Sequence, residues 1–171
     1  MGRASTKKNK NIYQISREAL GLTREKASEL LVGLTPERIE KIESEKSLPH
    51  PDEILLMAKG YKSPQLCNYF CANECPIGEK YVPEIEPKSL SEIVLEMLAS
   101  LNVMQRSRDR LIEITSNGQV EDDEVEDFVR IQAELERISV TVEALQLWAE
   151  QMLAEGRINL ELYRKYKEKT R

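Results

Sequence analysis

The fold is decided by residues 20–61, LGLTREKASELLVGLTPERIEKIESEKSLPHPDEILLMAKGY. Three helical patterns follow one another in this stretch, and each begins with a capping signal. The start signals are Thr23, Thr35 with Pro36, and His50 with Pro51. Apolar residues recur at helical spacing in each pattern: Ala27, Leu30 and Leu31; Ile39 and Ile42; Ile54, Leu55 and Ala58. Because the joints are too short to be independent linkers, we expect the three helices to share one small core.

This stretch resembles the Cro/repressor type of helix-turn-helix, the XRE family. The resemblance rests on GLTREKASELL (21–31), RIEKIESEKSLP (38–49) and ILLMAKGY (54–61). Its most specific part is the pair Ile42 and Glu43, followed by a Lys and then a Pro. It covers roughly residues 11–66, about a third of the chain. The resemblance implies a sequence-specific DNA-binding transcriptional regulator that places a helix in the major groove.

The same resemblance implies which residues meet double-stranded DNA. The first helix of the motif would begin at Thr23 and the recognition helix at about Thr35, with Arg24 placed for a phosphate. On the recognition helix, Arg38 and Lys41 are expected to project from the side opposite Ile39 and Ile42. The implied DNA-binding residues are Arg24, Thr35, Glu37, Arg38 and Lys41.

Three departures from the family pattern lead to an alternative hypothesis. The turn LLVGLTPER is about one residue longer than usual, Ser28 stands where a tightly packed Ala is customary, and Glu37 and Glu40 make the recognition helix acidic. A carboxylate near phosphates is repulsive unless it accepts from a cytosine amino group. The alternative is an acidic adaptor or antitoxin-like protein interaction module that retains the helix-turn-helix fold without specific DNA binding.

Composition bounds the class of protein. The chain has 171 residues, 40% of them hydrophobic, 32% charged and only 5% aromatic, which favours an all-helical soluble protein. Apolar runs stay well short of the ~18 residues that a membrane span needs. The polar N-terminus, GRASTKKNKN, lacks the apolar core of a signal peptide. We therefore expect a cytoplasmic protein without a membrane partner.

The net charge of −5 conceals an asymmetry along the chain. Residues 1–50 hold 10 Lys and Arg against 7 Asp and Glu, whereas residues 76–171 hold 13 against 20. The basic end is thus the helix-turn-helix end, as expected of a nucleic-acid-binding domain, although the excess is mild. Residues 1–10 are predicted to be a disordered basic arm, which is either a solubilising tail or a phosphate-contacting arm.

All three cysteines, Cys67, Cys71 and Cys75, lie in SPQLCNYFCANECPIG (63–78). Their C-x3-C-x3-C spacing suggests a metal or redox site, with zinc or an iron–sulfur cluster as the candidate cofactor. One zinc ion can collect all three sulfurs only if the helix breaks between Cys71 and Cys75, because a continuous helix would place Cys75 about 12 Å along the axis from Cys67. The other interpretation is ordinary packing of small apolar side chains.

Residues 76–88 contain three prolines and no helical period, which predicts an extended linker between a domain at 11–75 and a region at 89–171. Two long helices with heptad spacing should follow it. Their apolar stripes are Leu90, Val94, Met97, Leu101, Met104 and Leu111, then Phe128, Ile131, Leu135, Ile138, Val142, Leu145, Ala149 and Met152.

The predicted fold class is all-α: an N-terminal helix-turn-helix domain of five helices, then a C-terminal antiparallel helical hairpin of coiled-coil type. The leading helix, at 11–20, should bury Ile12, Ile15 and Leu20. A hairpin cannot bury a wide apolar stripe by itself, so it needs either the N-terminal domain or another copy of the chain. The role expected for the hairpin is either oligomerisation or reception of a signal. If it oligomerises the protein, we expect a homodimer. The sequence contains no glycine-rich phosphate loop, His-based triad or paired acid and base, so an enzyme is not expected.

Overall fold

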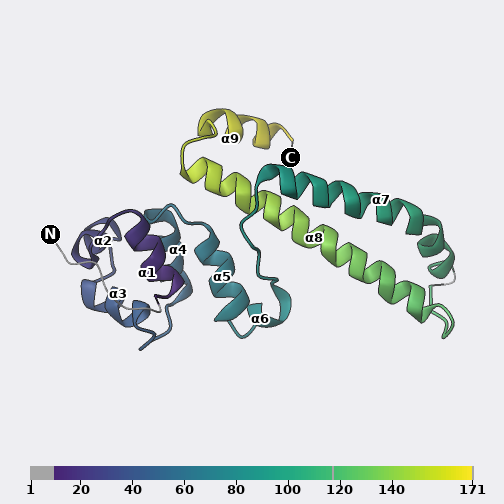
Figure 1. Ribbon diagram of the computed structural model, residues 1–171, viewed down its shortest axis with the longest axis horizontal. Helices are drawn as coiled ribbons and strands as arrows, with labels where there is room; N and C mark the ends of the chain where they lie inside the picture. The colour runs from purple at the N-terminus through teal and green to yellow at the C-terminus, as the bar shows by residue number, and fades with distance from the viewer. Residues whose placement is uncertain (1–9, 117, 171) are drawn as a thin grey trace. The chain divides into compact units, whose positions relative to one another are not determined.

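The computed structural model describes residues 10–116 and 118–170, and every regular element in these residues is an α-helix (Figure 1). The expected all-α class is confirmed. Contacts group residues 10–84 with 149–170 in a first unit and set residues 85–148 apart as a second unit. The predicted arm at 1–10 lies, except for Lys10, outside the described residues.

Five helices open the first unit: α1 (Ile12–Ala19), α2 (Arg24–Leu30), α3 (Pro36–Glu43), α4 (Pro51–Gly60) and α5 (Gln65–Asn73). The start signals work as the sequence predicts. The Thr23 hydroxyl accepts the Lys26 N–H, and the Thr35 hydroxyl accepts the Arg38 N–H. The His50 N–H donates to the Glu53 carboxylate at 2.7 Å at the start of α4. These bonds satisfy backbone donors that a helix start otherwise leaves unpaired.

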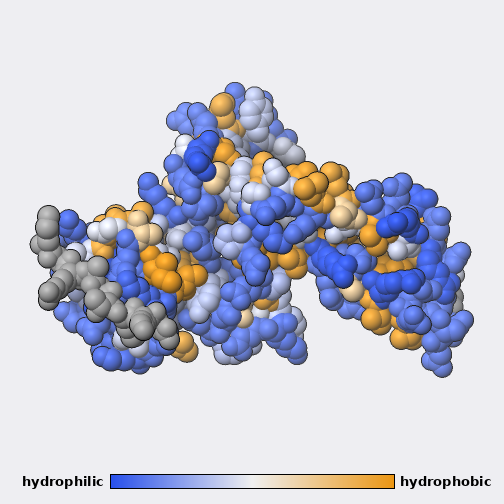
Figure 2. Space-filling view, in the orientation of Figure 1, coloured by the Kyte–Doolittle hydropathy of each residue, from blue (hydrophilic) through white to orange (hydrophobic). Residues whose placement is uncertain are grey.

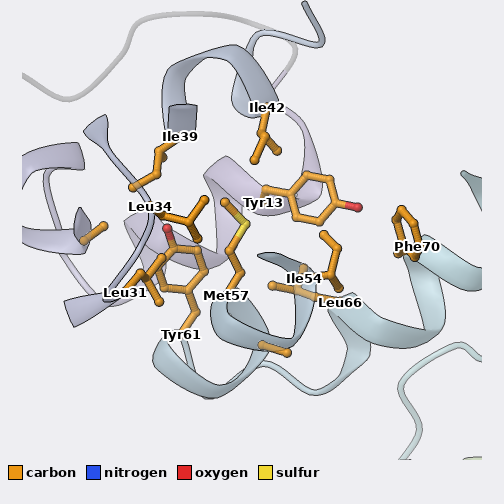
Figure 3. Packing of buried hydrophobic residues seen from close by; sticks show 12 residues of the cluster. Tyr13, Leu31, Leu34, Ile39, Ile42, Ile54, Met57, Tyr61, Leu66 and Phe70 are labelled. Carbon is orange, nitrogen blue, oxygen red and sulfur yellow. The ribbon is translucent and has the colours of Figure 1, made fainter. Parts of the chain in front are cut away.

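The core of this unit is a single cluster to which all five helices contribute (Figure 3). Ile39 and Ile42 of α3 are buried in it, as are Ile54 and Met57 of α4. The rest of the cluster is Tyr13, Ala27, Leu31, Leu34, Ala58, Tyr61, Leu66 and Phe70. Leu30 and Leu55, which share the predicted stripes, are exposed instead.

The buried face of α1 differs from the expected one. Ile15 and Leu20 are exposed, whereas the polar residues Gln14, Ser16 and Arg17 are buried beside Tyr13. The Tyr13 hydroxyl donates to the Glu74 carboxylate at 2.9 Å. The expectation of an Ile15 and Leu20 face is therefore wrong, because α1 packs through residues whose polar groups find partners in the fold.

The segment 76–88 is not extended throughout. It contains α6 (Gly78–Tyr81), one short helix that packs on α5. A Cβ at Gly78 would overlap the backbone carbonyl of Cys71, so only glycine permits this approach. The Asn68 side chain also donates to the Pro83 carbonyl at 3.0 Å. Residues 76–84 thus belong to the first unit as packed structure, which corrects the prediction of an extended linker there.

The second unit is built from α7 (Leu90–Ile114) and from α8 (Val125–Ala154) up to residue 148. The two helices lie side by side and antiparallel (Figure 1). Ser89 and Glu92 form the expected capping box at the start of α7. Arg110 of α7 bonds to Asp127 of α8 (Nε to Oδ2, 2.7 Å), which fixes their register near the turn. The remaining helix, α9 (Leu160–Lys169), belongs to the first unit.

The seam between α7 and α8 is rotated from the predicted heptad stripes. The buried residues are Ile93, Ser100 and Ile114 on α7, and Ile131, Thr141 and Ala144 on α8. Five residues of the predicted stripes are exposed: Leu90, Val94, Leu101, Leu135 and Val142. Of the six buried residues, Ile131 alone belongs to a predicted stripe, so heptad spacing did not predict which side of each helix meets its neighbour.

Replacing Ile42 by Ala should destabilise the first unit by about 2–5 kcal/mol, because Ile42 is 2% exposed and its loss leaves a cavity. Leu55→Ala is the matched control, since Leu55 is 63% exposed on α4 and should change stability by less than about 0.5 kcal/mol. Amide hydrogen exchange of α1 to α5 measures both variants separately from the second unit. Equal exchange in the two variants would contradict the assignment of Ile42 to the core.

Candidate nucleic-acid interface

The connection between α2 and α3 is longer than the family pattern, and the structure accommodates the extra length. Gly33 adopts φ +107°, a conformation that other residues rarely take. The Ser28 hydroxyl donates to the Leu34 carbonyl at 2.6 Å, and Leu34 is buried in the core. Ser28 therefore ties the longer connection back to α2. Two of the three departures in the sequence compensate for each other.

Glu43, the last residue of α3, is a buried carboxylate held by two arginines. Arg17 of α1 donates through Nε to Oε1 at 2.5 Å and through Nη2 to Oε2 at 3.0 Å. Arg24 of α2 donates through Nε to Oε2 at 2.8 Å. Arg17 also bonds to the Leu22 carbonyl in the joint between α1 and α2. One carboxylate thus fastens three helices together.

Arg24, expected to meet a phosphate, is half-buried and bonded to Glu43. The Arg24 side chain is 34% exposed. Glu43 also pairs with Arg17, so its single negative charge offsets that of Arg24 only in part. The sequence marked Glu43 as part of the family pattern but gave no sign that Arg24 was one of its partners.

Arg38 does not project freely from α3, which corrects the expectation from the sequence. Its Nε and Nη2 donate to the two carboxylate oxygens of Glu53 at 2.7 and 2.6 Å. Its Nη1 donates to the Ser47 hydroxyl and its Nη2 to the Leu48 carbonyl. Arg38 therefore joins α3 to the following loop and to the start of α4. The guanidinium holds the pKa of Glu53 below its ordinary value.

The other implied residues on α3 are exposed at the surface. Thr35 caps the helix and Lys41 is exposed on its last turn. Glu37 is also exposed, and its own backbone N–H and the Thr35 hydroxyl hold its pKa below the ordinary value. Glu37 is therefore ionised at neutral pH. Of the five implied contact residues, Thr35, Glu37 and Lys41 are the exposed ones.

Charges on this surface are predominantly acidic. Among residues 23–46, the exposed cations are Lys26, Lys41 and Lys46, and the exposed carboxylates are Glu25, Glu29, Glu37, Glu40 and Glu45. Both arginines in the range are in ion pairs. The exposed surface of residues 23–46 therefore carries more carboxylates than unpaired cations.

The cysteines are spread over α5 and the turn that follows. The helix does break between Cys71 and Cys75, since α5 ends at Asn73. In the part of the chain that the structure describes, however, no three His, Cys, Asp or Glu side chains are grouped to hold a metal ion. All three cysteines pack against the core of the first unit, and burial raises the pKa of the Cys67 thiol. These contacts favour the packing interpretation.

Comparison with protein-family models, curated proteins and solved structures finds no match to this chain. Within residues 10–116 and 118–170, each helix is too short or too polar to cross a lipid bilayer. The function must therefore be argued from the chain's own residues.

Replacing Arg38 by Ala should destabilise the first unit by about 1–3 kcal/mol, because Glu53, Ser47 and Leu48 all lose a charged donor. Glu40→Ala is the control, since its carboxylate is half exposed and lies 3.8 Å from Lys46. Chemical denaturation monitored by hydrogen exchange measures both. An Arg38→Ala variant as stable as wild type would show that these bonds contribute nothing.

The same ion pair predicts a pH dependence. Because the pKa of Glu53 is lower in the folded protein than in the unfolded chain, its stabilisation is present at neutral pH. It is lost as the pH falls through the lowered pKa. Glu53→Gln should therefore be less stable than wild type at pH 7, and the difference should shrink in acid. A difference that stays constant from neutral to acidic pH would contradict this assignment.

Proposed function

We propose that this protein is a sequence-specific DNA-binding transcriptional regulator that inserts α3 into the major groove through a helix-turn-helix made of α2 and α3. The observation that carries the proposal is the way α3 is held. Its inner side, Ile39, Ile42 and Glu43, is buried, while Thr35, Glu37 and Lys41 face solvent. An α-helix of about 10–12 Å diameter fits a major groove about 12 Å wide.

Rigid presentation supports this proposal. Glu43 ties the C-terminal end of α3 to α1 and α2, and Arg38 ties its N-terminal half to α4. A recognition element needs such fixed orientation, because base edges are read by hydrogen bonds of defined geometry. Lys41 would meet a phosphate or a guanine edge. Glu37 would be tolerated at a cytosine, whose amino group donates to a carboxylate.

The excess of exposed glutamates favours a second candidate, the acidic adaptor. A surface with five exposed carboxylates and three lysines repels phosphates and attracts a basic protein segment. In that case α3 would be the docking helix for a protein. Glu37→Gln with Glu40→Gln separates the candidates. The pair of changes weakens binding to a basic protein partner but strengthens nonspecific DNA binding by removing repulsion.

The test begins with recovery of genomic DNA bound to the tagged full chain. On a recovered site, Lys41→Ala should weaken binding by about 1–3 kcal/mol without loss of fold. Lys59→Ala, at the exposed last turn of α4, is the matched control and should bind like wild type. Fluorescence anisotropy at several salt concentrations measures both variants.

Absence of enriched DNA would refute the regulator and leave the adaptor. So would affinity that does not fall with salt, since phosphate contacts release counterions. Equal affinity of wild type and Lys41→Ala would refute the proposed seating of α3.

A further inference from the structure

The second unit exposes apolar side chains along both of its helices, and Figure 2 shows hydrophobic patches there. Val94 and Leu101 of α7 are 42% and 48% exposed, and Leu135 and Val142 of α8 are 47% and 39% exposed. All four belong to the heptad stripes of the sequence, yet none lies in the seam. We name these four residues the leucine–valine face.

The four residues lie on one side of the helix pair. Three of them follow a seam residue by one position: Val94 follows Ile93, Leu101 follows Ser100, and Val142 follows Thr141. Leu135 similarly follows Glu134, whose side chain is only 12% exposed. One residue turns an α-helix by about 100°. Because α7 and α8 run in opposite directions, the same step carries both helices to the same side of the pair.

Register then sets the neighbours within this face. Arg110 lies opposite Asp127. Leu101 lies nine residues from Arg110 and Leu135 lies eight from Asp127, both away from the turn, so the two leucines are nearly level. A further seven residues along each helix bring Val94 beside Val142. The face is thus a pair of leucines followed by a pair of valines, about 10 Å apart along the axis.

The other side of the pair has a different character. Residues one position before the seam, including Ala99, Ala133 and Val140, line an open groove together with Lys88, Glu96, Glu136 and Arg137. Charged side chains border that groove, whereas the leucine–valine face contains none. Only one side of the helix pair is therefore suited to burial.

We propose that the leucine–valine face binds the same face of a second copy of this chain, forming an antiparallel four-helix bundle. A two-fold axis between the leucine and valine pairs would set the valines of each copy on the leucines of the other. Small side chains then meet large ones, as close packing requires. Such an interface is self-complementary, which a two-fold dimer needs.

The available area matches a stable dimer. The leucine–valine face is the centre of the contact, and the dimer would extend it over this whole side of the helix pair. Twenty-four residues of helix are about 36 Å long, and two adjacent helices are about 20 Å wide, so full contact along this side would bury about 700 Å² of each copy. The total of about 1,400 Å² lies in the range of specific interfaces. The inference deepens the proposed function, because a two-fold dimer would present two α3 helices to two half-sites.

Sedimentation velocity of the full chain without DNA tests the interface. Wild type should sediment at twice the chain mass of 19.7 kDa. Leu101→Lys with Val142→Lys should raise the dimer Kd at least about 100-fold, because each copy would bury two unpaired lysine charges against Val94 and Leu135 of the other. Leu95→Lys with Val129→Lys is the matched control, since both residues are more than half exposed and lie two positions from the seam. That control should remain a dimer.

Circular dichroism checks that the variants fold. If the lysine pair fails to fold, Leu101→Gln with Val142→Gln should still weaken the dimer. A monomeric wild type overturns the proposal, and strong hydrogen-exchange protection of α7 in that monomer would indicate that the first unit covers the face instead. The proposal is also overturned if the dimer persists in both double-lysine variants, or if both variants weaken it equally. A monomer that binds DNA refutes only this interface, whereas a dimer without DNA binding refutes only the proposed function.

Discussion

The arrangement of the first unit depends on one buried carboxylate. Glu43 is almost completely removed from water, and a charge in that position is costly unless it is fully paired. Arg17 and Arg24 supply the pairing from α1 and α2. Moving α3 away from α1 or α2 would leave the Glu43 carboxylate without one of its partners, so the ion cluster constrains how α3 is oriented. The surface offered to a partner follows from that orientation.

Local signals in the sequence were sufficient for the helices themselves. Thr23, Thr35 and His50 mark helix starts because a cap needs only neighbours within three residues. Ile39 and Ile42 could be placed in the core for a similar reason, since spacing alone puts them on one face. The buried face of α1 could not be predicted, because Arg17 is buried through a partner 26 residues away. The spacing of apolar residues cannot identify polar side chains that are buried because they find partners in the fold.

The candidate site shows the same division. Thr35, Glu37 and Lys41 are exposed where helical spacing puts them, but Arg38 is captured by Glu53, fifteen residues further along the chain. The sequence of α3 alone does not indicate that the loop after it folds back against Arg38. Likewise, the sequence shows Ser28 only as a departure from the family pattern, because its partner, the Leu34 carbonyl, lies in the longer connection that follows. In the second unit, heptad spacing predicted apolar stripes on α7 and α8 but not which side of each helix is buried, because that depends on what packs against the helix.

The one-position offset between seam and exposed face has a consequence for how this chain can change over time. Inserting or deleting a single residue inside α7 or α8 turns everything beyond it by about 100°, so seam, apolar face and charged groove would exchange places along that helix. Substitutions act on one position, whereas such a change would reassign all three surfaces together. Insertions and deletions among homologues should therefore concentrate between Ile114 and Val125, because a change of length in this connection rotates neither helix.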